Sequence, residues 1–374
     1  MTTTQARPSA PPTLAPPPRW WNVRSPAVWA CGFLVVAATV LLLHHTVPAT
    51  VAYPRAAGTA AGLFALFAIP FIVLYRRMAW LQSVPPSLFL VAFLWGGTVA
   101  VMTSIFAVGA VRGLMASAVS PEWAEAWSSV LGAPLVEELI KTAGVVMVAL
   151  LAMWRLRSVL DGIFCGVFVG VGFQVVEGYA YALSATMMQR TGDVIEPAMS
   201  VFLVRGILAG LWSHAVLTAI VGAGIGYVIV RRNRPMWTRV GIAVAVFMAA
   251  VVLHALWNSP LMRDGFGLGT PGIFIGVLVK GLPAIILAAW LLRRFFVQEV
   301  ALRRRLITEY DNPEVFAPEE VDTLLSWKAR EAAVVQERKK AGRRAAQKLR
   351  RRHKEQLAQL AALHEKWWTE RGRV

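Results

Sequence analysis

Long apolar runs, separated by short polar segments, fill most of the chain between residues 28 and 292. Several runs exceed about 18 residues and lack the period-two alternation of barrel strands, which is typical of helices that cross a bilayer. Because lipid offers no hydrogen-bond partners to the backbone, these segments must be helical. We therefore predict an all-α fold, a polytopic transmembrane helical bundle with about eight spanning helices. Their predicted bounds are 28–47, 56–75, 87–109, 129–153, 159–185, 201–230, 238–258 and 272–292.

Composition and charge divide the chain into three parts. Of 374 residues, 57% are hydrophobic and 16% are charged, whereas soluble domains carry roughly 25% charged residues. The net charge is +17, and the last 82 residues hold 20 of the 38 Lys and Arg residues. We predict a disordered Pro-rich leader (1–27), a membrane domain (28–295) and a soluble, basic helical tail (296–374).

The tail is helix-prone and strongly basic, and its sequence leaves two interpretations open. A loose heptad, broken at Lys339, Gly342 and His353, allows a solvated or self-associating helix. The second interpretation is a basic helix that lies on anionic lipid, since each Lys or Arg near such a surface contributes about 1 kcal/mol to the binding free energy. We do not expect nucleic-acid binding, because no stacking platform or groove-reading motif accompanies the charge.

Arginines in the short loops predict the orientation of the bundle. Eleven arginines lie before the first helix or in one set of loops, against four in the alternate loops. The positive-inside rule makes the richer side cytoplasmic. We expect a multi-pass protein of the plasma (cell) membrane with both termini in the cytoplasm. The eleven are Arg7, Arg19, Arg24, Arg76, Arg77, Arg155, Arg157, Arg231, Arg232, Arg234 and Arg239, and the four are Arg55, Arg112, Arg190 and Arg263.

Ionisable residues interrupt the apolar runs, although each costs a few kcal/mol or more at membrane depth. With the predicted orientation and a rise of 1.5 Å per residue, Glu137 lies about 12 Å below the outer end of its helix. Glu177 lies at a similar depth, His214 lies a little deeper, and His254 lies near the outer end of its helix. Four helices thus place polar groups in the outer half of the membrane, and we predict one site with access from the outer side.

Glu137 and Glu138 are followed by Lys141, which shares a helical face with both. Lys141 can neutralise one carboxylate and leave the other available as a general base. The alternative is a polar clamp that only locks helices together.

The remaining polar groups suit two kinds of chemistry. Imidazole and carboxylate are ligands for zinc, and they can also orient a water and donate to an oxyanion without a metal. Glu177, however, can equally be a counter-ion for Arg205 or Lys280. His254 and Asn258 lie at i and i+4 and share a helical face.

Four short motifs on successive predicted helices resemble the pattern of a known family. They read Glu137-Glu138-Leu139-Ile140-Lys141, Phe173-Gln174-Val175-Val176-Glu177, His214, and His254-Ala255-Leu256-Trp257-Asn258. Together they resemble the PrsW family of intramembrane proteases, within the larger group of CAAX prenyl endopeptidases and bacteriocin-processing proteins. The resemblance covers roughly residues 129–260, the motif core of the membrane domain, which is therefore expected to be protease-like.

The resemblance implies an intramembrane endopeptidase, in a family described as metalloproteases, that cleaves membrane-anchored protein substrates. It implies that Glu137 activates water and that Lys141 holds Glu138. It also implies that His254 and Asn258 stabilise the oxyanion, with Phe173 in a supporting position. The catalytic candidates are thus Glu137, Glu138, Glu177, His254 and Asn258, and the candidate ligands of an expected zinc ion are His214, His254 and Glu177.

A regulatory role follows from the same resemblance, namely cleavage of an anti-sigma-factor-type membrane protein at its outer side. Two other classes of function remain open. Buried acids also make proton relays, which would suit a proton-coupled transporter or channel, although no inverted repeat is evident between the two halves. A catalytically inactive membrane scaffold is the second.

Overall fold

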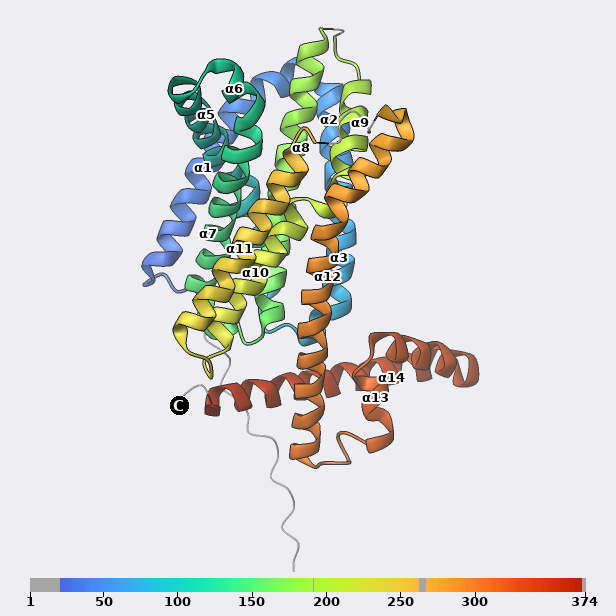
Figure 1. The fold of residues 1–374 in the computed structure, drawn as a ribbon. Helices are drawn as coiled ribbons and strands as arrows, with labels where there is room; N and C mark the ends of the chain where they lie inside the picture. The colour runs from blue at the N-terminus through green and yellow to red at the C-terminus, as the bar shows by residue number, and fades with distance from the viewer. Residues whose placement is uncertain (1–20, 191, 262–266, 372–374) are drawn as a thin grey trace, which may run out of the picture.

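The computed structural model describes residues 21–190, 192–261 and 267–371. Within these residues every regular element is helical (Figure 1), which confirms the predicted fold class. The α-helices are α1 (Pro26–Ala52), α2 (Pro54–Phe67), α3 (Ile69–Met78), α4 (Pro86–Leu94), α5 (Val101–Ala118), α6 (Pro121–Trp127), α7 (Ala133–Ala152), α8 (Val159–Gln189), α9 (Glu196–Val201), α10 (His214–Val230), α11 (Met236–Asn258), α12 (Gly269–Tyr310), α13 (Val321–Leu324) and α14 (Trp327–Arg371).

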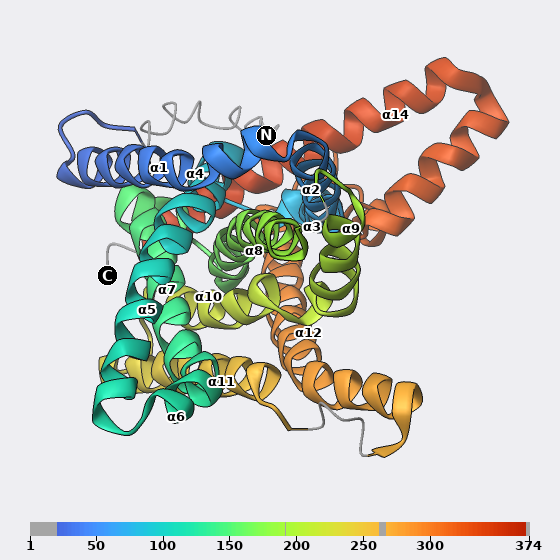
Figure 2. The same cartoon turned by 90° about the horizontal axis from the view of Figure 1, so that it is seen from above.

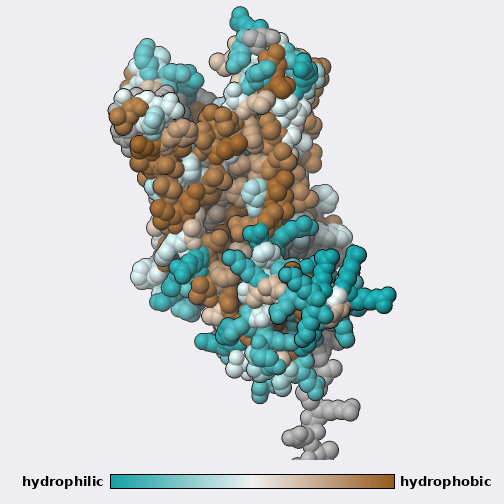
Figure 3. All heavy atoms as spheres, turned by 90° about the vertical axis from the view of Figure 1, so that its right-hand side faces the viewer, coloured by the Kyte–Doolittle hydropathy of each residue, from teal (hydrophilic) through white to brown (hydrophobic). Residues whose placement is uncertain are grey.

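Seven helical segments are long and apolar enough to cross a membrane, which identifies a multi-pass membrane protein. One of the eight predicted spans, over 129–153, is not among these seven. It corresponds to α7, whose 20 residues include the charged residues Glu137, Glu138 and Lys141. It packs against α5, α8, α10 and α11. Apolar side chains form a belt around the flank of the bundle in Figure 3, between polar ends. The seven segments are Pro26–Ala52, Pro54–Leu81, Pro86–Ala118, Val159–Gln189, Glu196–Val230, Met236–Asn258 and Gly269–Tyr310.

Helix α8 is the central element of the bundle, and its glycines explain how closely its neighbours approach. Figure 2, which looks along the bundle, shows α8 surrounded by the other spanning helices. A Cβ at Gly166 would lie 2.1 Å from the carbonyl oxygen of Thr218 on α10, and one at Gly170 would lie 2.3 Å from that of His214. Backbones can meet this closely only where the side chain is absent. The α8–α10 contact therefore sets the position of His214.

The two ends of the bundle differ. Helix α1 begins at the end where α14 lies across the bundle (Figure 1), so the start of the first span and the tail share one side. Which compartment this side faces stays a prediction. The predicted leader lies almost wholly outside the described residues, and the predicted boundary at 295 falls inside the continuous helix α12.

The tail packs against the bundle through a small core and a buried guanidinium. Leu306 and Ile307 of α12 pack with Leu360 of α14. Beside them Arg303 is 1% exposed. Its Nη1 and Nη2 donate to the carbonyls of Leu360 and Leu81 at 3.3 and 3.4 Å, and its Nε donates to Glu299 at 3.2 Å. One side chain thus joins α12, α14 and the end of the second span.

A second set of polar groups fastens α14 to the bundle. Arg157, between α7 and α8, pairs with Glu365 at 2.7 Å. Next to it His364 is 1% exposed. Burial, followed by the charges of Arg303 and Arg157, lowers the pKa of His364 to about 2. The ring is therefore neutral near pH 7 and adds no positive charge to this arginine-rich junction.

Substitution of Gly166 by Ala tests the α8–α10 contact. We expect Gly166→Ala to lower the free energy of unfolding by about 1–3 kcal/mol, because the new methyl group meets backbone on α10. Gly113→Ala on α5 is the matched control, since a Cβ there has nothing within 4 Å. Thermal unfolding in detergent measures both, and equal midpoints for the two variants would contradict the close approach.

Substitution of Arg303 by Met tests the docking of the tail. The change leaves the carbonyls of Leu360 and Leu81 without their donor, so docking should weaken by about 1–3 kcal/mol. Hydrogen exchange along the second half of α14 should accelerate accordingly. Arg304→Met, which removes a half-exposed guanidinium paired with Asp322, is the control and should leave exchange unchanged. Unaltered exchange in Arg303→Met would show that the buried guanidinium does not hold the tail.

Candidate active site and metal centre

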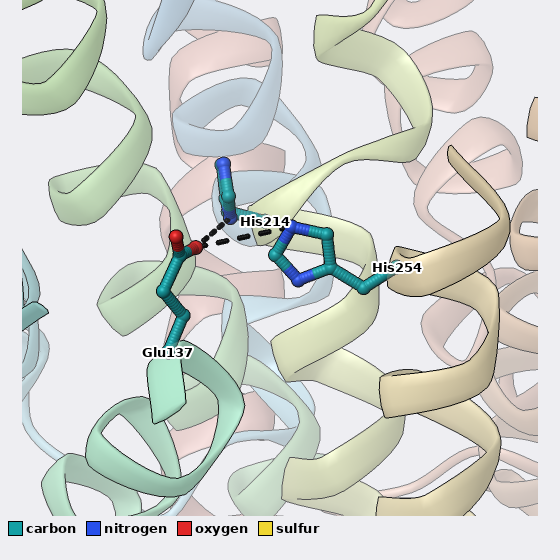
Figure 4. A group of neighbouring side chains, drawn as sticks. All are labelled: Glu137, His214 and His254. Atoms are coloured by element: carbon teal, nitrogen blue, oxygen red, sulfur yellow. Dashed lines mark ion pairs between the residues drawn. The ribbon is translucent and has the colours of Figure 1, made fainter. Parts of the chain in front are cut away.

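Side chains from three helices meet around one carboxylate oxygen. Glu137 comes from α7, His214 begins α10, and His254 lies in the last turns of α11 (Figure 4). Glu137 Oε2 is 3.8 Å from His214 Nδ1 and 3.8 Å from His254 Nε2. All three residues are buried, and one donor atom from each lies within 4.8 Å of the others. The structure thus brings together three of the residues that the sequence placed at one level.

Lys141 neutralises one of the two adjacent acids more directly than the other. Its Nζ lies 2.6 Å from Glu138 Oε1 but 4.0 Å from Glu137 Oε2. Glu138 and Lys141 are both 0% exposed, and His254 Nδ1 lies 3.0 Å from the same Oε1 atom. Glu138 therefore has two partners, whereas Glu137 remains available to the site.

The partners of the two imidazoles fix which ring nitrogens carry hydrogen. A carboxylate accepts, so His254 donates its Nδ1 hydrogen to Glu138 and turns Nε2 toward Glu137. An ammonium only donates, so His214 accepts from Lys141 at Nδ1, 2.9 Å away. His214 Nε2 then donates to Glu177 Oε2 at 3.1 Å. Both rings are held in a defined orientation by groups outside the Glu137 triangle.

Glu177 lies beside this group but is held by a cation. Arg205, in the segment Phe202–Leu208, places Nη2 2.5 Å from Glu177 Oε2, and its guanidinium lies 3.8 Å from the centroid of the Tyr181 ring. Arg205 is therefore the counter-ion of Glu177, one of the two partners that the sequence suggested. Lys280, the other candidate counter-ion, donates to the carbonyl of Ser259 at 2.6 Å. Glu177 thus bridges Arg205 and His214.

The sixth span is interrupted where it reaches the site. It changes from the segment Phe202–Leu208 to a short turn, Gly210–Trp212, before α10 begins at His214. Gln174 of α8 spans the break, because its amide nitrogen donates to the carbonyl of Arg205 at 3.1 Å and its oxygen accepts from Ser213 at 2.5 Å. The first turn of α10 is thereby tied to α8.

Sequence reasoning did not identify Gln174 and Ser213, and it considered Arg205 only as a partner of Glu177. A polar Gln inside an apolar run, directly before Val175 and Val176, was the available signal. Phe173, by contrast, was identified as a supporting residue. Its ring lies 4.7 Å from the His214 ring and 4.7 Å from Lys141 Nζ, so it packs against both and contributes a cation–π contact.

Asn258 lies near the site, but its side-chain amide is hydrogen-bonded to the backbone. Its Nδ2 donates to the carbonyl of Ser129 at 2.8 Å, which joins α11 to the segment before α7. Asn258 lines the same cavity as Glu137 and His254. Asn258 donates from Nδ2 to the Ser129 carbonyl, and His254 donates from Nδ1 to Glu138. The role of both residues in stabilising an oxyanion therefore stays a prediction.

A cavity of about 830 Å³ surrounds these residues. Its lining runs from Glu137 and His254 to Arg112 on α5 and Ser184 on α8, which lie toward the ends of those helices that are remote from α14 (Figure 1). Figure 3 shows a notch between two prongs at this end of the molecule. The volume lies in the range of sites for small molecules and peptide segments, roughly 300–1,000 Å³. The site is therefore approached from the side opposite the tail.

The residues around Glu137 suit a metal ion. Glu137 Oε2 is buried and has no hydrogen-bond partner among the described residues, and it lies 3.8 Å from His254 Nε2. An oxygen and two imidazole nitrogens are a zinc donor set, and tetrahedral zinc holds such atoms about 3.4 Å apart. Two of the observed separations are 3.8 Å and all three lie within 4.8 Å, so binding of the ion would draw the donor atoms closer together. His214 Nδ1 would have to exchange its hydrogen bond with Lys141 for the metal.

Comparison with known proteins agrees with this geometry. A model of PrsW family intramembrane metalloproteases matches residues 84–294, more than half of the chain and all four helices that carry Glu137, Glu177, His214 and His254. Neither a curated protein nor a solved structure matches the chain. The chain therefore belongs to the PrsW family of intramembrane metalloproteases, enzymes that act on protein substrates.

Proposed function

We propose that the protein hydrolyses a peptide bond in membrane-anchored proteins, on the side of the membrane remote from α14. The observation that carries this proposal is that Glu137 Oε2 has no hydrogen-bond partner among the described residues and lies 3.8 Å from a nitrogen of each imidazole, inside a cavity of about 830 Å³. A buried acceptor at this position can take a proton from a water that attacks a carbonyl. A cavity lined by residues of α5, α7, α8, α11 and α12, among other helices, admits a segment of a substrate that is itself held in the membrane.

We further propose that the site holds zinc through His214, His254 and the carboxylate of Glu137. Such an ion polarises a carbonyl and lowers the pKa of bound water toward neutrality. Glu177 was the expected third ligand, but its contact with Arg205 favours a role in orienting His214 instead. Glu138 and Lys141 hold His254 in the form that leaves its Nε2 free. With Oε2 bound to the ion, Glu137 would accept the proton through its other oxygen, Oε1.

The regulatory role implied by the family resemblance belongs to the same proposal. An anti-sigma-factor-type protein crosses the membrane once and presents a segment outside it, so a site in the outer half would reach that segment. With the predicted orientation, the end of the bundle remote from α14 is the outer end. Mapping of the fragments from a reconstituted substrate determines which side is cleaved.

A transporter or an inactive scaffold would leave Glu137 without this role. We expect Glu137→Gln to reduce cleavage of reconstituted single-pass substrates by at least about 100-fold, because the amide cannot accept the proton. Glu309→Gln, an exposed residue of α12, is the control for loss of a carboxylate. Persistent cleavage by Glu137→Gln would contradict the proposed base. Proton flux without any cleavage by the unaltered protein would instead favour transport.

Metal analysis tests the zinc proposal separately from activity. Protein purified without chelator should contain about one zinc ion per chain, and His254→Ala should lose most of it, because a three-donor site rarely retains zinc with two donors. His45→Ala is the control, since His45 lines the same cavity but does not belong to the donor group. Cleavage that is insensitive to a chelator, by protein without bound metal, would contradict the zinc site and leave the proposed role of Glu137 in place.

A further inference from the structure

Helix α14 folds back on itself to form a hairpin beside the bundle. The backbone at Gly342 has φ 86° and ψ −178°, which is not helical, and a side chain would be strained there. The two arms run side by side from this turn (Figure 2). Arg350 on the second arm pairs with Glu331 on the first at 2.8 Å. We call residues 327–354 the basic hairpin.

The turn of the basic hairpin concentrates positive charge. Residues 338–354 contain ten Lys and Arg residues and no Asp or Glu. Three of these arginines form ion pairs with acidic residues elsewhere in the tail. Five exposed residues around the turn form no ion pair with any other described residue. They are Arg338, Lys339, Lys340, Arg343 and Arg344.

The hairpin leaves the bundle at the level where the spanning helices end. Its first residue, Trp327, has the guanidinium of Arg77 at 4.7 Å from its ring centroid, and Arg77 lies in the last turn of α3. Three residues later, Arg330 lies 5.1 Å from the centroid of the Trp80 ring. Tryptophan and arginine in these positions are typical of the membrane–water interface. The contacts therefore hold the first arm near the surface of the bilayer.

The direction of the hairpin exposes its turn to lipid rather than to the protein. In Figure 2 the turn projects beyond the outline of the spanning helices. Figure 1 shows the hairpin lying across the direction of the bundle. In Figure 3 polar side chains lie directly next to the apolar belt. A bilayer that surrounds the belt would therefore extend over the turn.

Two other partners fit these observations less well. Self-association would need a free apolar seam, but Leu360, Leu363 and Trp367 of the second arm pack in the core with α12. Nucleic acid would need aromatic or groove-reading residues, and residues 338–354 contain no Phe, Tyr or Trp. Phosphate at a planar surface needs only unpaired cations at that level.

We propose that the turn of the basic hairpin binds the phosphate headgroups of anionic lipids at the surface of the membrane that holds the bundle. Each unpaired Lys or Arg contributes to such attraction, which falls off within a Debye length. The tail is then fixed at three places: the buried Arg303 junction, the contacts of Trp80 and Trp327, and the lipid surface.

The test places a fluorophore on Ala341→Cys, at the exposed turn, in the full-length protein; the native cysteines are both buried. The protein is reconstituted in nanodiscs of phosphatidylcholine, or of phosphatidylcholine and phosphatidylglycerol in equal parts, each with a headgroup quencher. We expect quenching to rise about fivefold or more with the anionic lipid, since each cation contributes about that factor. High salt should reverse the rise. A probe at Glu314→Cys, in the α12–α13 connection that lies farther from the bundle (Figure 1), should not respond.

Two variants decide whether charge is responsible. The rise should disappear in K339Q/K340Q/R343Q/R344Q and persist in K339R/K340R/R343K/R344K, which keeps every charge at the same positions. Equal quenching in the two lipids, or its loss in the charge-conserving variant, would overturn the proposal. Tight binding of a labelled RNA by protein in neutral nanodiscs, lost in the Gln variant and without any response to phosphatidylglycerol, would also overturn it and identify a nucleic-acid surface.

Discussion

The buried ion pair between Lys141 and Glu138 is the interaction on which the rest of the site depends. Both side chains are 0% exposed and lie in a helix surrounded by apolar neighbours. Removing either would leave an uncompensated charge, which is strongly destabilising in a low dielectric. The pair also determines the state of the site. Glu138 accepts from His254, and Lys141 donates to His214, so each imidazole presents a known nitrogen to its surroundings.

The architecture serves this arrangement through close backbone contacts. Gly166 and Gly170 bring α8 against α10, and Gln174 joins α8 to the broken segment before α10. His214 is therefore positioned by two independent constraints at the start of its helix. Glu177, one turn after Phe173, completes the support because it connects His214 to Arg205. Catalytic geometry of this kind requires side chains whose own partners are fixed.

The sequence predicted the elements well because membrane helices leave a strong signal in apolar run length. It also predicted that Glu137, Glu177, His214 and His254 would approach one another, since depth along a spanning helix follows from residue counting. It named Arg205 as one candidate counter-ion of Glu177 but could not choose between this pairing, Lys280 and a ligand role, because pairing depends on helix rotation and on the break at residues 209–213. The hairpin at Gly342 and the buried Arg303 were likewise hidden, since tail docking depends on contacts between distant segments.

X-ray absorption at the zinc edge, on protein purified without chelator, tests most directly whether Glu137, His214 and His254 form one centre. The account predicts a first shell of nitrogen and oxygen at about 2.0–2.1 Å, with the outer-shell scattering of two imidazoles, one of which is lost in His214→Ala. A zinc spectrum without imidazole scattering would contradict the convergence of these helices on a shared metal site.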